Sequence, residues 1–221
     1  MATHAVVLMG PQAPGALRKA MRRVGVEVRR LSDAAAEVHL DEEPALKATE
    51  QLSAHEAFDV ACLPLEGREK KMLIADMDST MVAEETLDEL AAAFGFGEQV
   101  RGITDLSMRG ELNFEEALRR RVGLLYGVAI DNALDTIRKR TTVNTGADIL
   151  VQTMRTRGAH TALVTGGFDV FAGPIGGEIG FKDTYANRLR SVDGVLTGEV
   201  AEPILGPDAK AERLALLCQE H

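Results

Sequence analysis

Short apolar runs and two amphipathic segments alternate over the first 65 residues of the chain. The pattern predicts strands at residues 5–9, 26–31, 37–40 and 58–63, and helices at residues 15–23 and 45–53. This βαββαβ order is typical of a ferredoxin-like α+β fold, so we expect residues 1–66 to form a small module of their own. The polar stretch at residues 66–71 contains a glycine and is the expected linker.

The rest of the chain begins with an apolar run at residues 72–75, which is typical of a central parallel strand buried on both faces. Helical patterns follow at residues 86–94, 99–108, 113–126 and 130–140, then at 147–157 and 208–217, with a strand at 160–164 and a hairpin around Asp193-Gly194. This order predicts an α/β core with a Rossmann-type parallel sheet, built from residues 70–84 and 145–221, and an inserted helical-bundle cap at residues 85–144. Glycines and Pro174 weaken the helix pattern over residues 173–180, so we expect a short or frayed helix there.

Charge and composition exclude several classes of function. The 34 acidic residues outnumber the 25 basic ones and give a formal net charge of -9, which repels phosphate backbones, so we expect no nucleic-acid partner. No segment approaches the roughly 20 apolar residues that span a bilayer, so we expect no membrane association. Cys62 and Cys218 form no close C-x-x-C pair, which favours a reducing compartment, and the expected location is the cytoplasm.

Two carboxylates follow the apolar run at residues 72–75 directly. Asp76 and Asp78 stand at the C-terminal end of the expected strand, where α/β sheets bind ligands. Alternation along an extended chain puts both carboxylates on one side, close enough to share a divalent cation and to divide the roles of nucleophile and acid/base. A lone D-x-D pattern fits a solvated acidic turn, but the preceding apolar run and the following Thr80 favour a catalytic site.

A second expected strand ends in the sequence Thr165-Gly166-Gly167-Phe168. A hydroxyl group and a small residue with a free backbone N–H can approach a phosphate closely. Alone, this sequence fits an ordinary turn between a strand and a helix. Together with Asp76 and Asp78 it indicates phosphate binding, because a phosphoryl group in transfer needs donors aimed at its oxygens.

Two residues of the third cap helix are candidates for substrate recognition. Phe114 and Arg121 are seven residues apart and therefore face the same way, with Leu118 near the same stripe. A guanidinium on an otherwise apolar face suits bidentate capture of a carboxylate, and Glu85 could bind the ammonium group of the same small molecule. Arg121 could equally be a structural ion-pair partner, and Phe114 could simply pack in the core.

From residue 70 to residue 216 the chain resembles the haloacid dehalogenase superfamily of phosphatases, and more closely its phosphoserine phosphatase family. The motifs that carry this resemblance are Asp76-Met77-Asp78-Ser79-Thr80, Glu85-Thr86-Leu87-Asp88-Glu89, Leu112-Asn113-Phe114-Glu115, Arg119-Arg120-Arg121-Val122, Thr165-Gly166-Gly167-Phe168, Ala186-Asn187-Arg188-Leu189 and Asp193-Gly194-Val195-Leu196-Thr197-Gly198. The resemblance implies hydrolysis of L-phosphoserine to L-serine and phosphate, a step of serine biosynthesis. It also implies that the N-terminal module is ACT-like and senses an amino acid or dimerises.

The resemblance assigns a role to each candidate residue. Asp76 would attack phosphorus to form an aspartyl-phosphate, and Asp78 would protonate the leaving serine oxygen and later activate water. Mg2+ would bind Asp76 and Asp78, the latter through its backbone carbonyl. The phosphoryl group would be bound by Ser79, Thr165, Gly166 and Lys210, and the amino-acid part by Glu85, Met108, Phe114 and Arg121.

The chain departs from the family pattern in one respect. Members of the family continue to a Gly-Asp-Gly-x-x-Asp motif that completes the Mg2+ site, whereas this sequence contains no Gly-Asp pair. We therefore expect a C-terminally incomplete core with an open sheet edge, which would favour association into a homodimer. An inactive fragment, an amino-acid-binding regulatory protein and a related phosphotransferase are the alternatives to a working phosphatase.

Overall fold

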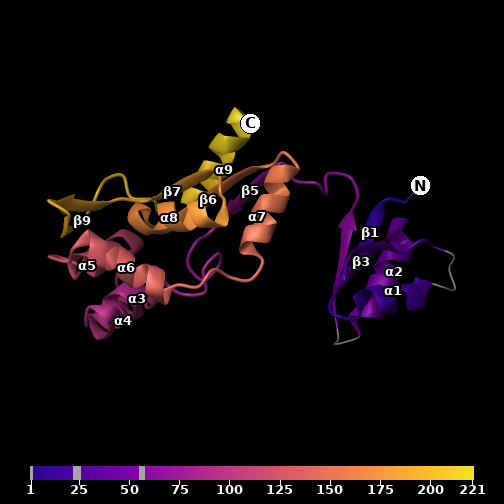
Figure 1. Ribbon diagram of the computed structural model, residues 1–221, viewed down its shortest axis with the longest axis horizontal. Helices are drawn as coiled ribbons and strands as arrows, with labels where there is room; N and C mark the ends of the chain where they lie inside the picture. Colours follow the sequence, from indigo (N-terminus) through magenta and orange to yellow (C-terminus); the bar gives the residue numbers. More distant parts are fainter. Residues whose placement is uncertain (1, 22–25, 55–57) are drawn as a thin grey trace. The chain divides into compact units, whose positions relative to one another are not determined.

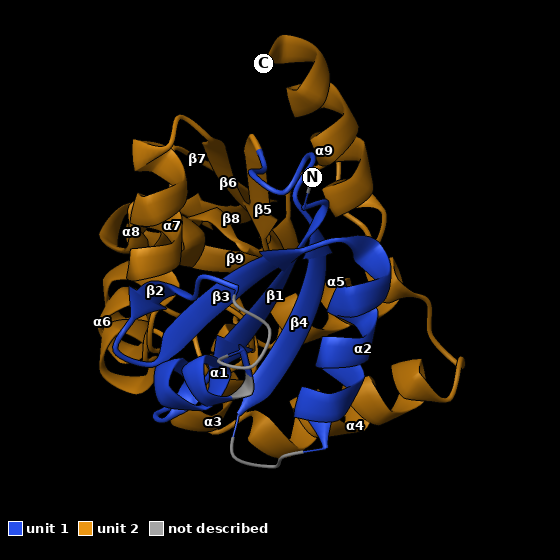
Figure 2. Cartoon of the chain, turned by 90° about the vertical axis from the view of Figure 1, so that its right-hand side faces the viewer, with its two compact units in different colours: residues 1–70 blue, residues 71–221 orange. Residues whose placement is uncertain are grey.

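The computed structural model describes residues 2–21, 26–54 and 58–221 of the chain. It divides into two compact units, Met1–Lys70 and Lys71–His221 (Figure 2). None of the helices in these described ranges is long and apolar enough to cross a membrane. Each unit has its own apolar core and is described separately below.

The first unit consists of a four-stranded antiparallel sheet and two helices. Its elements are β1 (His4–Met9), α1 (Ala13–Met21), β2 (Arg29–Ser32), β3 (Ala35–Leu40), α2 (Glu42–Ser53) and β4 (Asp59–Pro64), and the strand order is β2-β3-β1-β4. Alternate side chains of β1 and β3, such as Val6 and Val38, pack with Leu17 of α1 and Leu52 of α2 in one core. The end of the helix expected at residues 15–23 lies outside the described residues.

A three-stranded parallel sheet forms the centre of the second unit (Figure 1). Its strands are β5 (Met72–Ala75), β6 (His160–Phe168) and β7 (Asp183–Asn187), in the order β5-β6-β7. Leu217 of α9 (Ala209–Glu220) packs with Ala162 and Val164 of β6, while Leu163 of β6 packs with α7 (Ala147–Thr156) and α8 (Asp169–Ile179). Side chains that alternate along β6 thus meet different helices, as expected for a strand buried on both faces.

The helix α8 is longer and more regular than the sequence predicts. It runs over 11 residues with Pro174 inside it, so the expectation of a short or frayed helix is wrong. A Cβ atom on Gly176 would lie 2.6 Å from Thr184 Oγ1, which shows how closely the helix approaches β7. Burial of Phe171 and Ile175 against the core outweighs the unfavourable glycine and proline propensities.

Four helices between β5 and α7 form the cap of the second unit. They are α3 (Thr86–Ala93), α4 (Gly97–Met108), α5 (Phe114–Gly123) and α6 (Ile130–Arg140). The two chain segments that enter and leave the cap lie antiparallel, because Val82 bridges Val143 and the Ala83 N–H donates to the Thr142 carbonyl at 3.0 Å. The start of α5 follows the prediction, since the Asn113 side chain accepts from the Glu116 N–H at 2.8 Å.

A β-hairpin provides a second attachment between core and cap. Strands β8 (Leu189–Val192) and β9 (Val195–Val200) are joined by Asp193 and Gly194, with φ angles of 50° and 76°. These angles are those of a two-residue primed turn, which confirms the hairpin expected from the sequence. The Gly127 N–H donates to the Leu196 carbonyl at 2.9 Å, so the hairpin is bonded to the chain between α5 and α6.

Candidate active site

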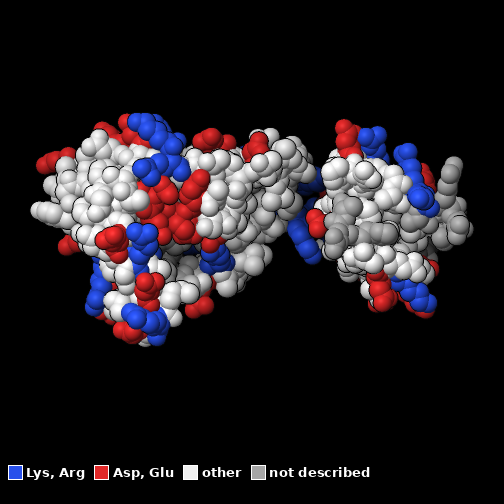
Figure 3. Space-filling model, turned by 90° about the horizontal axis from the view of Figure 1, so that it is seen from below, with Lys and Arg blue, Asp and Glu red and all other residues white. Residues whose placement is uncertain are grey.

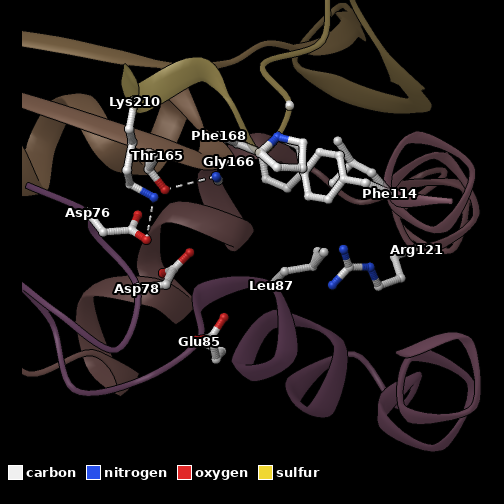
Figure 4. A pocket seen from close by; sticks show the side chains of 14 residues that line it. Asp76, Asp78, Glu85, Leu87, Phe114, Arg121, Thr165, Gly166, Phe168 and Lys210 are labelled. Carbon is white, nitrogen blue, oxygen red and sulfur yellow. Dashed lines mark hydrogen bonds and ion pairs between the residues drawn. The ribbon is translucent and has the colours of Figure 1, made fainter. Parts of the chain in front are cut away.

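A cavity of about 320 Å³ lies where β5 and β6 end and the cap begins (Figure 4). Because Ala75 pairs with Leu163 in the parallel register, the residues that follow both strands emerge side by side. The cavity combines acidic, basic, apolar and glycine residues from core and cap. Its lining consists of Asp76, Asp78, Glu85, Leu87, Phe114, Leu118, Arg121, Thr165, Gly166, Gly167, Phe168, Gly206, Pro207 and Lys210.

Both oxygens of the Asp76 carboxylate have partners. Its Oδ1 accepts from the Met77 N–H at 2.8 Å, and its Oδ2 accepts from Lys210 Nζ at 2.7 Å. Lys210 comes from the first turn of α9, so the cation disfavoured there by the helix dipole has a carboxylate partner. The ion pair fixes the direction of the Asp76 side chain and leaves it partly open to the cavity (Figure 4).

Asp78 is a partly buried carboxyl group whose pKa is raised. Burial is the main cause that raises the pKa of Asp78 to about 6, and the negative charges of Glu85 and Asp76 raise it further. The Thr86 N–H opposes this shift by donating to Asp78 Oδ1 at 3.1 Å. A carboxyl group of this pKa can both donate and accept a proton close to neutral pH.

The C-terminal part of β6 presents donors of the kind that a phosphate requires. Thr165 is almost fully buried, and its Oγ1 accepts from the Gly167 N–H at 2.9 Å, so its hydroxyl proton remains available to another acceptor. A Cβ atom on Gly167 would lie 3.0 Å from Met77 Cε and 3.2 Å from Asp78 Oδ2. Glycine at this position therefore lets this part of β6 approach Asp78.

Two residues of opposite charge, Glu85 and Arg121, also line the cavity. Arg121 reaches it from α5 together with Phe114, whereas Glu85, which precedes α3, lies beside Asp78 (Figure 4). Burial lowers the pKa of Arg121, while the negative charges of Asp88 and Glu85 act in the opposite direction. Its Nε donates weakly to the Ala117 carbonyl at 3.4 Å.

Two residues of the predicted site lie outside the cavity lining. Ser79 is exposed in a left-handed conformation with a φ of 51°, and its hydroxyl donates to Glu85 Oε1 at 2.6 Å instead of pointing to a phosphate position. Met108 is the last residue of α4, and 84% of it is exposed. The structure brings together the other predicted residues, Asp76, Asp78, Glu85, Phe114, Arg121, Thr165, Gly166 and Lys210.

The cavity lining also includes residues to which the sequence assigned no role. Gly206 and Pro207 come from the chain just before α9, and Gly167 comes from β6 next to Thr165 and Gly166. For Gly167 the signal was its place in the Thr165-Gly166-Gly167-Phe168 sequence. Nothing in the sequence indicated that Gly206 and Pro207 would face the cavity.

Asp76 and Asp78 both bring carboxylate oxygens to the cavity, which is the donor type that a divalent cation takes. Acidic side chains are gathered on one face of the second unit, with basic ones beside them (Figure 3). Among the described residues, no group of three or more His, Cys, Asp or Glu side chains is placed to hold a metal ion. Two carboxylates in one cavity nevertheless fit Mg2+, which commonly uses one or two carboxylates, substrate phosphate oxygens and water.

Comparisons with known proteins agree with this geometry. Residues 73–221 match the family model of haloacid dehalogenase-like hydrolases. The chain is 42% identical over 147 residues to a phosphoserine phosphatase of Methanocaldococcus jannaschii, covering 66% of this chain and 69% of that protein. It is 36% identical over 178 residues to a phosphoserine phosphatase of Saccharomyces cerevisiae, covering 79% of this chain and 58% of that protein.

A solved structure extends the similarity to the whole chain. A haloacid dehalogenase-family hydrolase of Salmonella enterica serovar Typhi superposes with a TM-score of 0.82 at 25% sequence identity, covering 100% of this chain and 79% of that one. The first unit is therefore included in the structural likeness. This chain spans 69% of the first relative, 58% of the second and 79% of the solved structure.

Proposed function

The chain belongs to the haloacid dehalogenase-like hydrolases, and we propose that within this family it hydrolyses L-phosphoserine to L-serine and inorganic phosphate. One observation carries the proposal: a single cavity is lined by a carboxylate paired with a lysine, Asp76 with Lys210, and by one further acidic and one basic side chain, Glu85 and Arg121. The first pair suits phosphoryl transfer, and the second suits the zwitterionic part of an amino acid.

The amino-acid end of the substrate fits the charges contributed by the cap and its entry segment. Arg121 can bind a carboxylate with two parallel hydrogen bonds, and Glu85 can accept from an ammonium group. The half-buried guanidinium of Arg121 lines the cavity, and its one side-chain hydrogen bond, to the Ala117 carbonyl, is long at 3.4 Å, so its other N–H groups can donate to a substrate carboxylate. A sugar or nucleotide phosphate offers no such pair of charges, which favours a phosphorylated amino acid.

The phosphoryl end of the substrate fits the core residues. Asp76 attacks phosphorus, and the bond from phosphorus to the serine oxygen breaks as the aspartyl-phosphate forms. Lys210, the Thr165 hydroxyl and the backbone N–H of Gly166 are placed around Asp76 to stabilise the negative charge on the transferring group. The ion pair with Lys210 keeps the Asp76 carboxylate oriented before the substrate binds.

Asp78 carries the proton in both halves of the reaction. Its neutral form donates a proton to the leaving serine oxygen, which releases L-serine. The resulting carboxylate then takes a proton from the water that attacks the aspartyl-phosphate, and phosphate leaves while Asp76 is regenerated. A pKa of about 6 keeps both forms accessible near neutral pH.

We infer that the divalent metal is Mg2+ and that Asp76 and Asp78 hold it, the latter through its backbone carbonyl. Both residues offer the hard oxygen donors that Mg2+ requires. When bound, Mg2+ would neutralise part of the charge on the transferring phosphoryl group. The Asp76 pair with Lys210 supplies part of the same compensation from the chain itself.

For the first unit we propose an ACT-like, ferredoxin-like module that binds an amino acid or pairs with a second copy. The βαββαβ element order and the sheet order β2-β3-β1-β4 support this assignment. We further infer that the whole chain works in the cytoplasm.

The proposed activity is tested by measuring inorganic phosphate released from L-phosphoserine, with and without Mg2+. We expect release that requires Mg2+ and is lost in Asp76→Asn, because an amide is a poor nucleophile. Asp135→Asn, which changes an exposed aspartate of α6, is the matched control and should keep the wild-type rate. Phosphate release that persists in Asp76→Asn would show that Asp76 is not the nucleophile. Phosphate release from phosphorylated sugars as fast as from L-phosphoserine would contradict the proposed substrate.

A further inference from the structure

Asn187 is a buried polar residue to which the proposed reaction gives no role. It ends β7, and only 1% of it is exposed. Burying an amide is costly unless its donors and acceptor find partners. In this structure they all do, and every partner is an uncharged main-chain group.

The first partner is the carbonyl of Gly166, in the C-terminal part of β6. The pairing of β6 with β7 shifts between Val164 and Phe168, so three residues of β6 lie opposite one residue of β7. This bulge takes the Gly166 carbonyl out of the regular ladder. Asn187 Nδ2 donates to that carbonyl at 2.9 Å, and the side chain thereby replaces the missing strand partner.

The second partner belongs to the segment that carries the phosphate-binding lysine. Asn187 Oδ1 accepts from the Leu205 N–H at 2.7 Å, and Nδ2 lies 3.5 Å from the Leu205 carbonyl. Leu205 directly precedes Gly206 and Pro207, which line the cavity, and Lys210 follows in the first turn of α9. One side chain therefore bonds both main-chain segments that flank the phosphate position.

We propose that Asn187 is a positioning residue that fixes the distance between the bulged C-terminal part of β6, which carries Thr165 and Gly166, and the segment leading to Lys210. A side chain with a donor and an acceptor on one planar group suits this task, because it can hold a carbonyl and an N–H at a set separation. The inference rests on the proposed function, since it assumes that Gly166 and Lys210 bind the same phosphoryl group.

Two substitutions separate this role from simple packing. Asn187→Asp keeps the shape and the acceptor for the Leu205 N–H, but its ionised form cannot donate to the Gly166 carbonyl. Its protonated form can donate, and burial raises the pKa of such a carboxyl group. Asn187→Leu removes both bonds while filling a similar volume. Asn132→Asp, on the exposed face of α6, is the matched control.

The test is calorimetric titration of inorganic phosphate into each variant in the presence of Mg2+. The titrations are run at several pH values, at a temperature below the unfolding temperature of every variant. We expect Asn187→Asp to bind phosphate at least tenfold more weakly than wild type at pH 8, and the ratio of the two affinities to approach one near pH 5. Asn132→Asp should match wild type at both pH values. A ratio of one for Asn187→Asp at both pH values would overturn the proposal.

Amide hydrogen exchange supplies a readout that needs no ligand. In Asn187→Leu we expect the Leu205 amide to exchange at least tenfold faster than in wild type, while the Leu163 amide in the middle of β6 keeps its protection. Unchanged exchange at Leu205 would overturn the proposal. If wild type fails to bind phosphate, the proposed phosphate site is wrong, and the exchange comparison still decides whether Asn187 holds the Leu205 segment.

Discussion

The Nζ atom of Lys210 lies 2.7 Å from the Oδ2 atom of Asp76, although the two residues are separated by 134 positions in the chain. The pair joins α9 to the end of β5 and places a cation beside Asp76, the proposed nucleophile. An aspartate that attacks a phosphate dianion brings two negative groups together. A lysine in contact with the nucleophile before binding lowers this repulsion without any movement of the chain at the moment of reaction.

Replacing this lysine should therefore slow the reaction and not merely weaken binding. We expect Lys210→Met to lower kcat for L-phosphoserine by about 100-fold or more, the usual cost of losing a charge-stabilising group in an active site. The measurement is steady-state phosphate release. Lys139→Met, which alters an exposed lysine of α6, should retain the wild-type rate. An unchanged kcat in Lys210→Met would remove the lysine from phosphoryl transfer.

The raised pKa of Asp78 makes stability depend on pH in a predictable direction. Its pKa in the folded chain, about 6, is above its ordinary value of 3.8, so the folded state binds more protons than the unfolded state between these values. Stability contributed by this group is fully present below pH 4 and is lost as the pH rises through 6.

The variant Asp78→Asn removes this dependence, because the amide stays neutral at every pH. We expect it to exceed wild type in free energy of unfolding by on the order of 1–3 kcal/mol at pH 8, with the difference vanishing near pH 4. Denaturant unfolding at a series of pH values measures it. A difference that is constant between pH 4 and pH 8 would contradict the raised pKa.

Recognition of the substrate carboxylate by Arg121 predicts a substrate-dependent loss. Arg121→Met should lower kcat/KM for L-phosphoserine by about 100-fold, but should change kcat/KM for O-phosphoethanolamine, which lacks the carboxylate, by less than about threefold. The adjacent Arg120→Met is the control, since Arg120 is exposed and pairs with Glu116 on the same helix. Equal losses on the two substrates would make Arg121 a structural residue.

The close approach of Gly167 to Asp78 predicts that two glycine substitutions will differ in their effect on kcat. Gly167→Ala places a methyl group 3.0 Å from Met77 Cε and 3.2 Å from Asp78 Oδ2, so we expect kcat to fall by about tenfold or more. A Cβ on Gly177 of α8 meets no atom within 4 Å, so Gly177→Ala should leave kcat unchanged and stabilise the chain by about 0.5–1 kcal/mol. Kinetics and thermal unfolding of both variants check the pair.

Local periodicity explains which site residues the sequence could predict. The common end of two parallel strands brings Asp76, Asp78 and Thr165 to one cavity, and the helical repeat turns Phe114 and Arg121 the same way. Alternation along an extended chain was the wrong reason for Asp78, because β5 ends at Ala75 and the chain already turns at Asp78. Ser79 follows in the same turn with a φ of 51°, which directs its hydroxyl to Glu85. A sequence motif does not show such a turn.

Long-range packing accounts for the rest of what the sequence did not predict. The regularity of α8 depends on how closely Gly176 packs against Thr184, a contact between residues on different elements that propensity alone does not describe. The bonds of Asn187 likewise join segments on either side of the hairpin. The N-terminal cap of α5, by contrast, needed only the spacing of Asn113 and Glu116 and was predicted correctly.

The cap of the second unit is fastened along two separate lines, one at the bridge between Val82 and Val143 and one where β9 bonds the chain around Gly127. With only the first attachment, the cap could rotate about the two chain segments that connect it to the core. The second attachment restricts this rotation, because a larger rotation must move the hairpin with the cap or break the main-chain hydrogen bonds between them. We therefore expect any tilt of the cap that widens the cavity to bend β8 and β9 with it.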